Sequence, residues 1–349
     1  MLIVYPQPPG HFYQSVTYMA HLAAELFEAE LLIVPEQKLS RYKRQLNILT
    51  PRFRGSESCL LICPGPEHLW SLYSVPGWKT RFGKLFGWVI DSFYFDRVTR
   101  GMDFCRQFDH LFVTRKEDIE EWTRRLKTPT TWLPWGSDVL RVGSQESERP
   151  WDVIRIGRQP DEWDDDSEVA RECENISLSF HGRPEVVSED GISGQRHLMG
   201  LCAQSKFQLA FSNMAHFSQY THPTRAYITA RWVDALASGT VVAGIAPRCA
   251  EVDELFWPGA TLDLGTVHRK EGLQKIADAR RSWRPEHAQT NYLRSLERLD
   301  WRWRFAIIAN LMNESPNKLR AEIDLLKRAI QAGSQRISGE TVGAPNHAS

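Results

Sequence analysis

The stretch Arg231–Pro247, RWVDALASGTVVAGIAP, has the pattern of a helix end, a glycine turn and a buried strand. Gly239 stands where a chain leaving a helix takes up a positive φ, and residues 241–245 form a short apolar run of strand length. A buried strand that follows a helix in this way is typical of α/β folds, whose parallel strands are covered on both faces. We therefore expect the same repeat elsewhere in the chain.

Apolar runs of strand length alternate with helical segments in both halves of the sequence. The segment Phe12–Phe27, for example, has helical length and an apolar stripe, and it lies between two such runs. The pattern restarts after the polar stretch RVGSQESERP, which has the composition of a linker. The predicted strands are Leu2–Tyr5, Leu31–Val34, Cys59–Cys63, Leu85–Ile90, His110–Val113 and Thr131–Pro134 in the first half, and Val153–Gly157, Ile176–Gly182, Phe207–Ser212 and Val241–Ile245 in the second.

The length of the chain, 349 residues, also favours two domains, because one hydrophobic core rarely serves so many residues. We predict an α/β fold with a first domain over residues 1–148 and a second over residues 149–332, which ends in helices. Residues 333–349 are small and polar without apolar periodicity, which predicts a disordered tail. A single large mixed sheet remains the alternative.

Composition excludes several functions. Lys and Arg number 43 and Asp and Glu also 43, so no net field attracts nucleic acid, and none is expected as a partner. No apolar stretch approaches the ~20 residues of a membrane span, and no signal peptide is evident, so we expect a cytoplasmic protein. The six cysteines have no metal-ligand spacing, and we expect no metal. The absence of GxGxxG and GxxxxGK[ST] motifs argues against a dinucleotide-dependent dehydrogenase and a P-loop enzyme.

Several polar residues directly follow predicted strands. In open α/β sheets, ligands bind at the carboxyl ends of the strands. Gly10 and His11 follow the first strand, Asp91 follows the strand that ends at Ile90, and Arg158 follows the first strand of the second half. These residues are therefore candidates for a site. Asp91 also suits the first position of a helix, where an aspartate caps the backbone, and that remains its alternative role.

Asp234 is an aspartate within a predicted helix of about four turns from Pro223. On a helical wheel it lies opposite Trp232 and Leu236, on the same side as Arg231, so it points away from the main core. Asp234 and Arg231 are three residues apart, which also suits an exposed ion pair.

Three motifs resemble those of bacterial glycosyltransferases with two facing Rossmann-like domains, the GT-B architecture. These motifs are ITARWVDALASGTVVAGIAP, WLPWGSD and IRIGRQP. The first is similar to the R-[FW]-x-E-A-L-A-x-G pattern of the group-1-like branch, with Asp where that family usually has Glu. The element order is similar over most of the chain. The resemblance implies that the carboxyl-terminal helix, with its stripe through Leu319 and Leu326, crosses back to brace the domains.

The resemblance also implies roles for individual residues. The Asp234 carboxylate would bind the ribose hydroxyls of a nucleotide sugar, with Arg231 in the same site. Arg158 would bind the diphosphate, and Gly239 and Thr240 would contact the nucleotide through their backbones. Retaining members carry an acidic residue eight positions before the ribose carboxylate, where this chain has Ala226, and this difference argues against a retaining mechanism.

An inverting transfer needs a general base, for which Asp91 is the first candidate and His11 the second. The sequence thus predicts a glycosyltransferase that needs no metal or cofactor and uses a nucleotide sugar and a glycan, lipid-linked or other hydroxyl acceptor. A nucleotide-sugar epimerase and a non-catalytic nucleotide-binding or glycan-binding module are the alternatives. The stretches Trp78–Trp88 and Arg41–Arg54 are rich in basic residues, which suggests peripheral contact with anionic lipid at the inner membrane face; solvated loops are the alternative.

Overall fold

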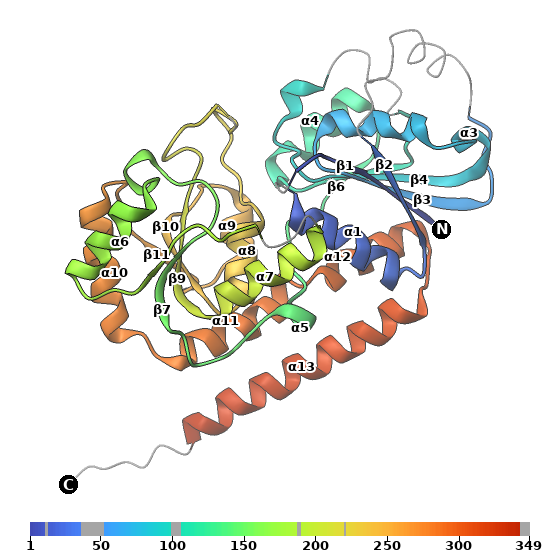
Figure 1. The fold of residues 1–349 in the computed structure, drawn as a ribbon. Coiled ribbons are helices and arrows are strands. Elements are labelled where there is room, and N and C mark those ends of the chain that lie inside the picture. The colour runs from blue at the N-terminus through green and yellow to red at the C-terminus, as the bar shows by residue number, and fades with distance from the viewer. Residues whose placement is uncertain (11–12, 36–51, 99–105, 187–189, 220, 343–349) are drawn as a thin grey trace.

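The computed structural model describes residues 1–10, 13–35, 52–98, 106–186, 190–219 and 221–342. It contains two parallel sheets, each with helices on both faces (Figure 1), and this confirms the predicted α/β class. The first sheet and its helices comprise β1 (Leu2–Gln7), α1 (Gln14–Leu26), β2 (Glu30–Pro35), β3 (Glu57–Cys63), η1 (Pro66–Ser74), α3 (Trp78–Arg81), β4 (Phe82–Val89), η2 (Phe95–Arg97), β5 (His110–Val113), η4 (Lys116–Asp118), α4 (Ile119–Leu126) and β6 (Thr130–Trp132).

A linker that contains α5 leads from β6 to the second sheet. The remaining elements are α5 (Val139–Val142), β7 (Trp151–Arg155), η5 (Asp161–Trp163), α6 (Asp166–Asn175), β8 (Phe180–His181), α7 (Gly191–Ala203), β9 (Ser205–Phe211), α8 (Ala230–Ala237), β10 (Val241–Ile245), α9 (Ala250–Leu255), β11 (Thr261–Asp263), α10 (Arg269–Ser282), α11 (Pro285–Arg298), α12 (Trp301–Met312) and α13 (Asn317–Val342).

The two sheets share one strand order. The first sheet runs β2-β1-β3-β4-β5-β6 and the second runs β11-β10-β9-β7-β8, and the strand pairs are parallel. In each sheet the second strand lies outside the first, and the third lies on the first strand's other side. This is the doubly wound order 2-1-3-4-5, with one added strand in the first sheet.

Strands of both sheets send alternate side chains to opposite faces. In β1, Ile3 and Tyr5 belong to the core beneath α1 and α12, whereas Leu2 and Val4 belong to the core on the other side of the sheet. Both sets are buried, which explains why the strands read as continuous apolar runs rather than as an alternation of apolar and polar residues.

Helix α12 returns from the second domain and packs on the first sheet. Trp301 lies edge-on against Trp88 of β4, with ring centroids 5.6 Å apart, and Phe305 lies edge-on against Phe27, 6.0 Å away. Helix α13 then runs back past α1 and α11 (Figure 1). The crossing of the carboxyl-terminal helices between the domains is therefore confirmed, and these helices are shared by both domains.

The structure differs from the prediction at the carboxyl-terminal end. Helix α13 continues to Val342, although the sequence predicts a disordered tail from residue 333. Gly333 packs closely on α11, where an added Cβ would come within 2.8 Å of Leu293 Cδ1. This contact places the first residue of the predicted tail against α11. Residues 343–349 lie outside the described residues.

Other departures concern the second domain. Helix α8 begins at Ala230, not at Pro223, because the preceding segment is drawn to the first domain, where Tyr227 stacks on Phe93. Of the predicted strand Ile176–Gly182, only the two residues of β8 form a strand. The strand β11 was not predicted, because its three residues are too few to show an apolar pattern. Within the described residues, no helix is both long enough and apolar enough to cross a bilayer.

A buried charged cluster joins the linker to the start of α12. Arg302 Nη1 donates to Asp138 Oδ1 at 2.8 Å and to Asp300 Oδ1 at 2.9 Å, and none of the three side chains is exposed. The Tyr18 hydroxyl donates to Asp138 Oδ2 at 2.8 Å, and the Leu140 N–H donates to Asp300 Oδ2 at 2.9 Å. Each carboxylate thus has a hydrogen-bond donor besides the guanidinium, as a buried ion pair requires.

Replacing Arg302 with methionine should therefore destabilise the protein strongly. The change leaves two buried carboxylates without their cation, and breaking a buried pair in this way costs about 3–5 kcal/mol. Urea denaturation of the wild type and the variant measures the free energy of unfolding. The matched control is Arg294→Met, which removes an exposed pair with Glu297 and should cost less than about 1 kcal/mol. Equal losses in the two variants would contradict this account.

Candidate functional site

The strand order creates one switch point in each sheet. These points lie between β1 and β3 in the first sheet and between β7 and β9 in the second. Connections leave the neighbouring strands in opposite directions there, and ligands of doubly wound sheets bind beyond the carboxyl ends of those strands. Residues that follow these strands are therefore the first candidates for a site.

Asp91 lies beside the switch point of the first sheet. Its N–H donates to the Pro64 carbonyl beyond β3 at 2.8 Å, and the Tyr13 hydroxyl donates to its Oδ2 at 2.9 Å. Burial raises the pKa of Asp91 to about 7, while the hydrogen bond from Tyr13 and the positive charges of Arg97 and Arg158 act in the opposite direction. A carboxyl group with this pKa gains and loses its proton near neutral pH, as a general base must.

Arg158 lies at the switch point of the second sheet. It follows β7, and its Nη1 donates to Ser218 Oγ, in the segment after β9, at 3.2 Å. Gly157, with φ +71°, turns the chain there, and Arg231 Nη1 donates to the Arg158 carbonyl at 2.7 Å. Burial, and to a lesser extent the charge of Arg158, lower the pKa of Arg231 to about 10. Two neighbouring guanidinium groups repel one another, so the arrangement favours an anion between them.

Aromatic side chains join the two domains next to Asp91. Phe93 stacks on Tyr227 of the second domain, with centroids 3.5 Å apart and planes 5° from parallel. The Arg97 guanidinium lies 3.5 Å from the centroid of the Tyr94 ring, and His222 of the second domain lies 6.0 Å from that ring. Asp91 therefore sits at the contact between the domains rather than on an open face of the first.

Ion pairs extend this contact. Arg225 of the second domain pairs with Asp118 at 3.0 Å and with Glu121 at 2.9 Å. Arg115, which follows β5, donates from Nε to the Ala226 carbonyl at 3.0 Å. Asp118 is buried, so its pairing with Arg225 is shielded from salt better than a surface pair. These contacts hold the segment before α8 against the first domain.

Asp234 lies on α8, one turn after Arg231, and its carboxylate is bound by protein groups. Ser137 Oγ donates to Oδ1 at 2.6 Å, and Gln195 Nε2 of α7 donates to Oδ2 at 2.8 Å. Burial raises the pKa of Asp234 to about 6, against both hydrogen bonds. Arg231 donates to Arg158 instead of forming the alternative ion pair with Asp234. The contact of Asp234 with a ribose stays a prediction.

Gly239 and Thr240 lie elsewhere, and their expected contact with a nucleotide is corrected. They precede β10, at the edge of the sheet opposite to Arg158. Gly239 has the positive φ that the sequence predicts, +77°, and a Cβ there would come within 2.4 Å of Arg149 Nη2. The buried Thr240 hydroxyl donates to the Cys202 carbonyl at 2.6 Å. Both residues pack around Arg149. Ligands of such sheets bind at the opposite edge, beyond the carboxyl ends of the strands.

Gly10 and His11 were predicted to lie beyond β1. Gly10 is exposed there, with φ +84°, at the switch point of the first sheet. His11 lies outside the described residues. Among the residues that the structure does describe, no three His, Cys, Asp or Glu side chains converge as metal ligands would.

The residues predicted to face lipid are partly engaged within the protein. Trp78 and Trp88 are buried, and Arg52 and Arg54 both pair with Asp109. The side chains of Trp78, Trp88 and Arg52 therefore contribute to the folding of the first domain, whereas those of Phe53 and Arg54 are exposed, and contact with lipid stays a prediction. The remaining basic residues of that prediction, Arg41, Lys43 and Arg44, lie outside the described residues.

Three residues around Asp91 were not singled out in the sequence. Tyr13 binds its carboxylate, and Phe93 and Tyr227 stack on each other at the nearby domain contact. The run DSFYFDR, from Asp91 to Arg97, is a usable signal, because aromatic and charged residues crowd together directly after a buried strand. Tyr227 gave no such signal, since its segment has the appearance of a helix in sequence.

Comparisons place the fold beside two solved structures. The crystal structure of TarM has a TM-score of 0.42 and 12% identity, over 73% of this chain and 54% of that one, so the chain spans about half its length. The glycotransferase of kitacinnamycin has a TM-score of 0.38 and 12% identity, over 94% and 98% of the two chains. No family model and no curated protein matches the sequence. Neither structural similarity decides what the protein does, and the assignment rests on the site.

The raised pKa of Asp91 predicts how its replacement changes stability. The folded-state value of about 7 exceeds the ordinary value of about 4, so the folded protein retains a proton that the unfolded chain releases. The free energy of unfolding therefore falls as pH rises from 4 to 7, and the full loss is present above 7. Asp91→Asn keeps an acceptor for the Tyr13 hydroxyl and removes this loss.

We expect Asp91→Asn to raise the Tm relative to the wild type at pH 8 and to raise it less at pH 5. Calorimetry at both pH values measures the difference. Asp324→Asn, an exposed change on α13, serves as the control and should shift the Tm equally at both pH values. A gain for Asp91→Asn that does not depend on pH would show that its carboxyl titrates in the ordinary range.

Proposed function

We propose that the protein is a glycosyltransferase that moves a sugar from a nucleotide sugar, bound by the second domain, to a hydroxyl acceptor at the first. One observation carries the proposal. Asp91, a carboxyl group with a pKa of about 7 beside the switch point of the first sheet, lies within electrostatic reach of Arg158 at the switch point of the second. A base and an anion-binding group from two domains are what transfer from a phosphorylated donor requires.

The two arginines would bind the diphosphate of the donor. Arg158 is exposed, and Arg231 lies beside it, so phosphate oxygens could accept hydrogen bonds from both guanidinium groups. As the bond between the sugar and the diphosphate breaks, negative charge grows on the leaving oxygen. Positive charge fixed at that position stabilises the transition state more than the ground state, which is the condition for catalysis.

Asp91 would act on the acceptor. Its carboxylate takes the proton of the acceptor hydroxyl while that oxygen forms a bond to the anomeric carbon, and the nucleoside diphosphate leaves with the electron pair of the broken bond. Tyr13 holds the carboxylate through Oδ2, which leaves Oδ1 for the acceptor. Attack from the side opposite the leaving group inverts the anomeric carbon, in agreement with Ala226 at the position where retaining members carry an acid.

A non-catalytic nucleotide-binding module is the second candidate. The observation that favours it is the state of Asp234, because both of its carboxylate oxygens already accept hydrogen bonds from Ser137 and Gln195. A ribose hydroxyl would have to share one of these oxygens with the protein donor already bound to it. Such a module would bind the donor and would not consume it.

Nucleotide binding is tested first, by thermal shift with UDP, GDP, ADP, TDP and their sugars. A ligand that binds only the folded state raises the Tm with concentration. We expect one nucleotide family to do so, and Arg158→Gln to weaken its binding about tenfold or more, as loss of a charged hydrogen bond would. Arg183→Gln removes an exposed arginine of the same domain and should leave affinity unchanged. A protein that no nucleotide stabilises would contradict both candidate functions.

Turnover then separates the two candidates. Once the donor is identified, its turnover is measured as release of the nucleoside diphosphate in the presence of acceptor sugars. The rate of this release should depend on Asp91. We expect Asp91→Asn to reduce kcat about 10²–10⁴-fold with unchanged donor affinity, since that is the usual contribution of a general base. In the wild type, kcat/KM should rise with pH up to about 7 and then level off, because the carboxylate is the active form. Binding without any turnover would favour the non-catalytic module.

A further inference from the structure

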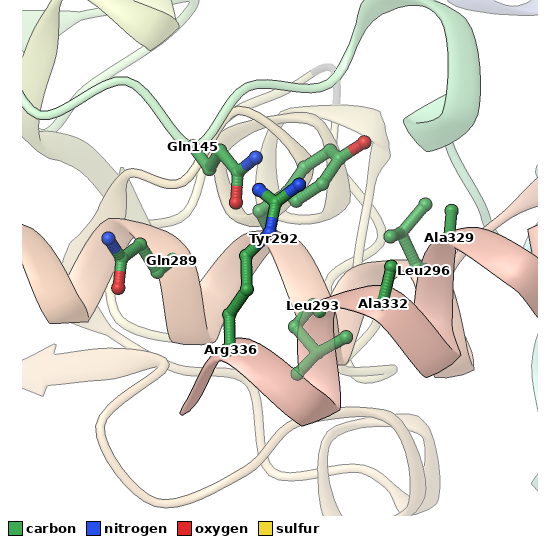
Figure 2. Close-up of a pocket in the computed structure, with 9 residues that line it drawn as sticks. Gln145, Gln289, Tyr292, Leu293, Leu296, Ala329, Ala332 and Arg336 are labelled. Carbon is green, nitrogen blue, oxygen red and sulfur yellow. The ribbon is translucent and has the colours of Figure 1, made fainter. Parts of the chain in front are cut away.

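A hollow lies between α11, α13 and the linker (Figure 2), and none of the residues that line it belongs to the proposed site. Its volume is about 320 Å³, at the lower end of the range for small-molecule sites. Its lining comes from all three segments: Gln145 of the linker, Gln289, Tyr292, Leu293 and Leu296 of α11, and Ala329, Ala332, Gly333 and Arg336 of α13.

One side of the hollow is apolar. Leu293 and Leu296 are buried, and Ala329 and Ala332 face them from α13. Gly333 allows α13 to approach, because a Cβ at this position would come within 2.8 Å of Leu293 Cδ1. The two helices therefore meet beside the hollow and leave a short hydrocarbon-lined recess that is partly open to solvent.

The rest of the lining is polar. Figure 2 shows the Arg336 side chain extended across the hollow, with its guanidinium group toward Gln145 and Tyr292. In the described part of the chain, the side chains of Arg336, Gln145, Gln289 and Tyr292 have no hydrogen-bond or ion-pair partner. A guanidinium, two amides and a phenol thus line the same hollow, and none of them is bound to another protein group in the described part of the chain.

We propose that this hollow binds a small amphipathic anion, in which a single carboxylate or phosphate group is attached to a short hydrocarbon body. The anionic group accepts hydrogen bonds from Arg336 and the neighbouring amides, because guanidinium groups bind planar oxyanions in a bidentate manner. The hydrocarbon body occupies the recess between Leu293, Leu296 and the alanines and removes that surface from water. This site is separate from the proposed donor and acceptor site and does not depend on the proposed function.

Calorimetric titration of the whole protein with hexanoate, hexyl phosphate and hexanol tests the proposal. We expect one-to-one binding of at least one anion and at least about tenfold weaker binding of hexanol, because the alcohol lacks the charge that Arg336 recognises. The two anions show whether the site prefers a carboxylate or a phosphate. Inorganic phosphate should bind more weakly than hexyl phosphate, since it leaves the apolar recess empty.

Variants then assign the binding to this hollow. Arg336→Gln should weaken anion binding about tenfold or more, whereas Arg328→Gln, the same change on the same helix outside the hollow, should not. Ala332→Leu should abolish binding by filling the recess; Ala332 is exposed, so the larger side chain is compatible with folding. Equal effects of the two arginine variants, or the absence of one-to-one binding to the wild type, would overturn the proposal.

Discussion

The arrangement of the two domains depends on Arg302 and the two buried carboxylates that it joins. Asp138 belongs to the loop that leaves the first sheet, and Asp300 belongs to the turn that starts the returning helix. The guanidinium therefore ties the chain's exit from the first domain to its re-entry. Buried charges are stable only when they are paired and hydrogen-bonded. The pairing with Arg302 therefore holds Asp138, at the start of the linker, in a fixed position. The stacking of Phe93 on Tyr227 and the pairing of Arg225 with Asp118 also hold the second domain against the first.

The site depends on this placement because neither domain contains all of it. Asp91 and Tyr13 come from the first domain, and Arg158 and Arg231 come from the second. Burial raises the pKa of Asp91 and lowers that of Arg231, so the folded protein disfavours the charged form of each group. Such groups are typical of functional sites, where chemistry rather than stability determines the residue.

Much of the fold could be predicted from the sequence. The strands Cys59–Cys63 and Val241–Ile245 are buried on both faces of their sheets. Strands buried in this way appear in sequence as continuous apolar runs, which can be recognised directly. Asp91 and Arg158 could be placed beyond strand ends because a polar residue directly after a buried strand is a local feature of the sequence, and their roles stay predictions. The segment before α8 could not be predicted, because Tyr227 is held by Phe93, more than a hundred residues away in sequence. Gly239 was correctly placed at a helix end, but the resemblance assigned it to the wrong edge of the sheet.

The packing of Trp301 and Phe305 on Trp88 and Phe27 also affects the synthesis of the protein. The first sheet is complete at Trp132, yet one of its faces is covered by a helix that is translated only after the whole second sheet. At ordinary elongation rates the ribosome needs roughly 10 to 30 s to cover that interval. During this time the apolar face beneath α12 is exposed on a nascent chain, where it resembles the surfaces that chaperones bind. The amino-terminal half is therefore first to be made but cannot finish folding until α12 has emerged.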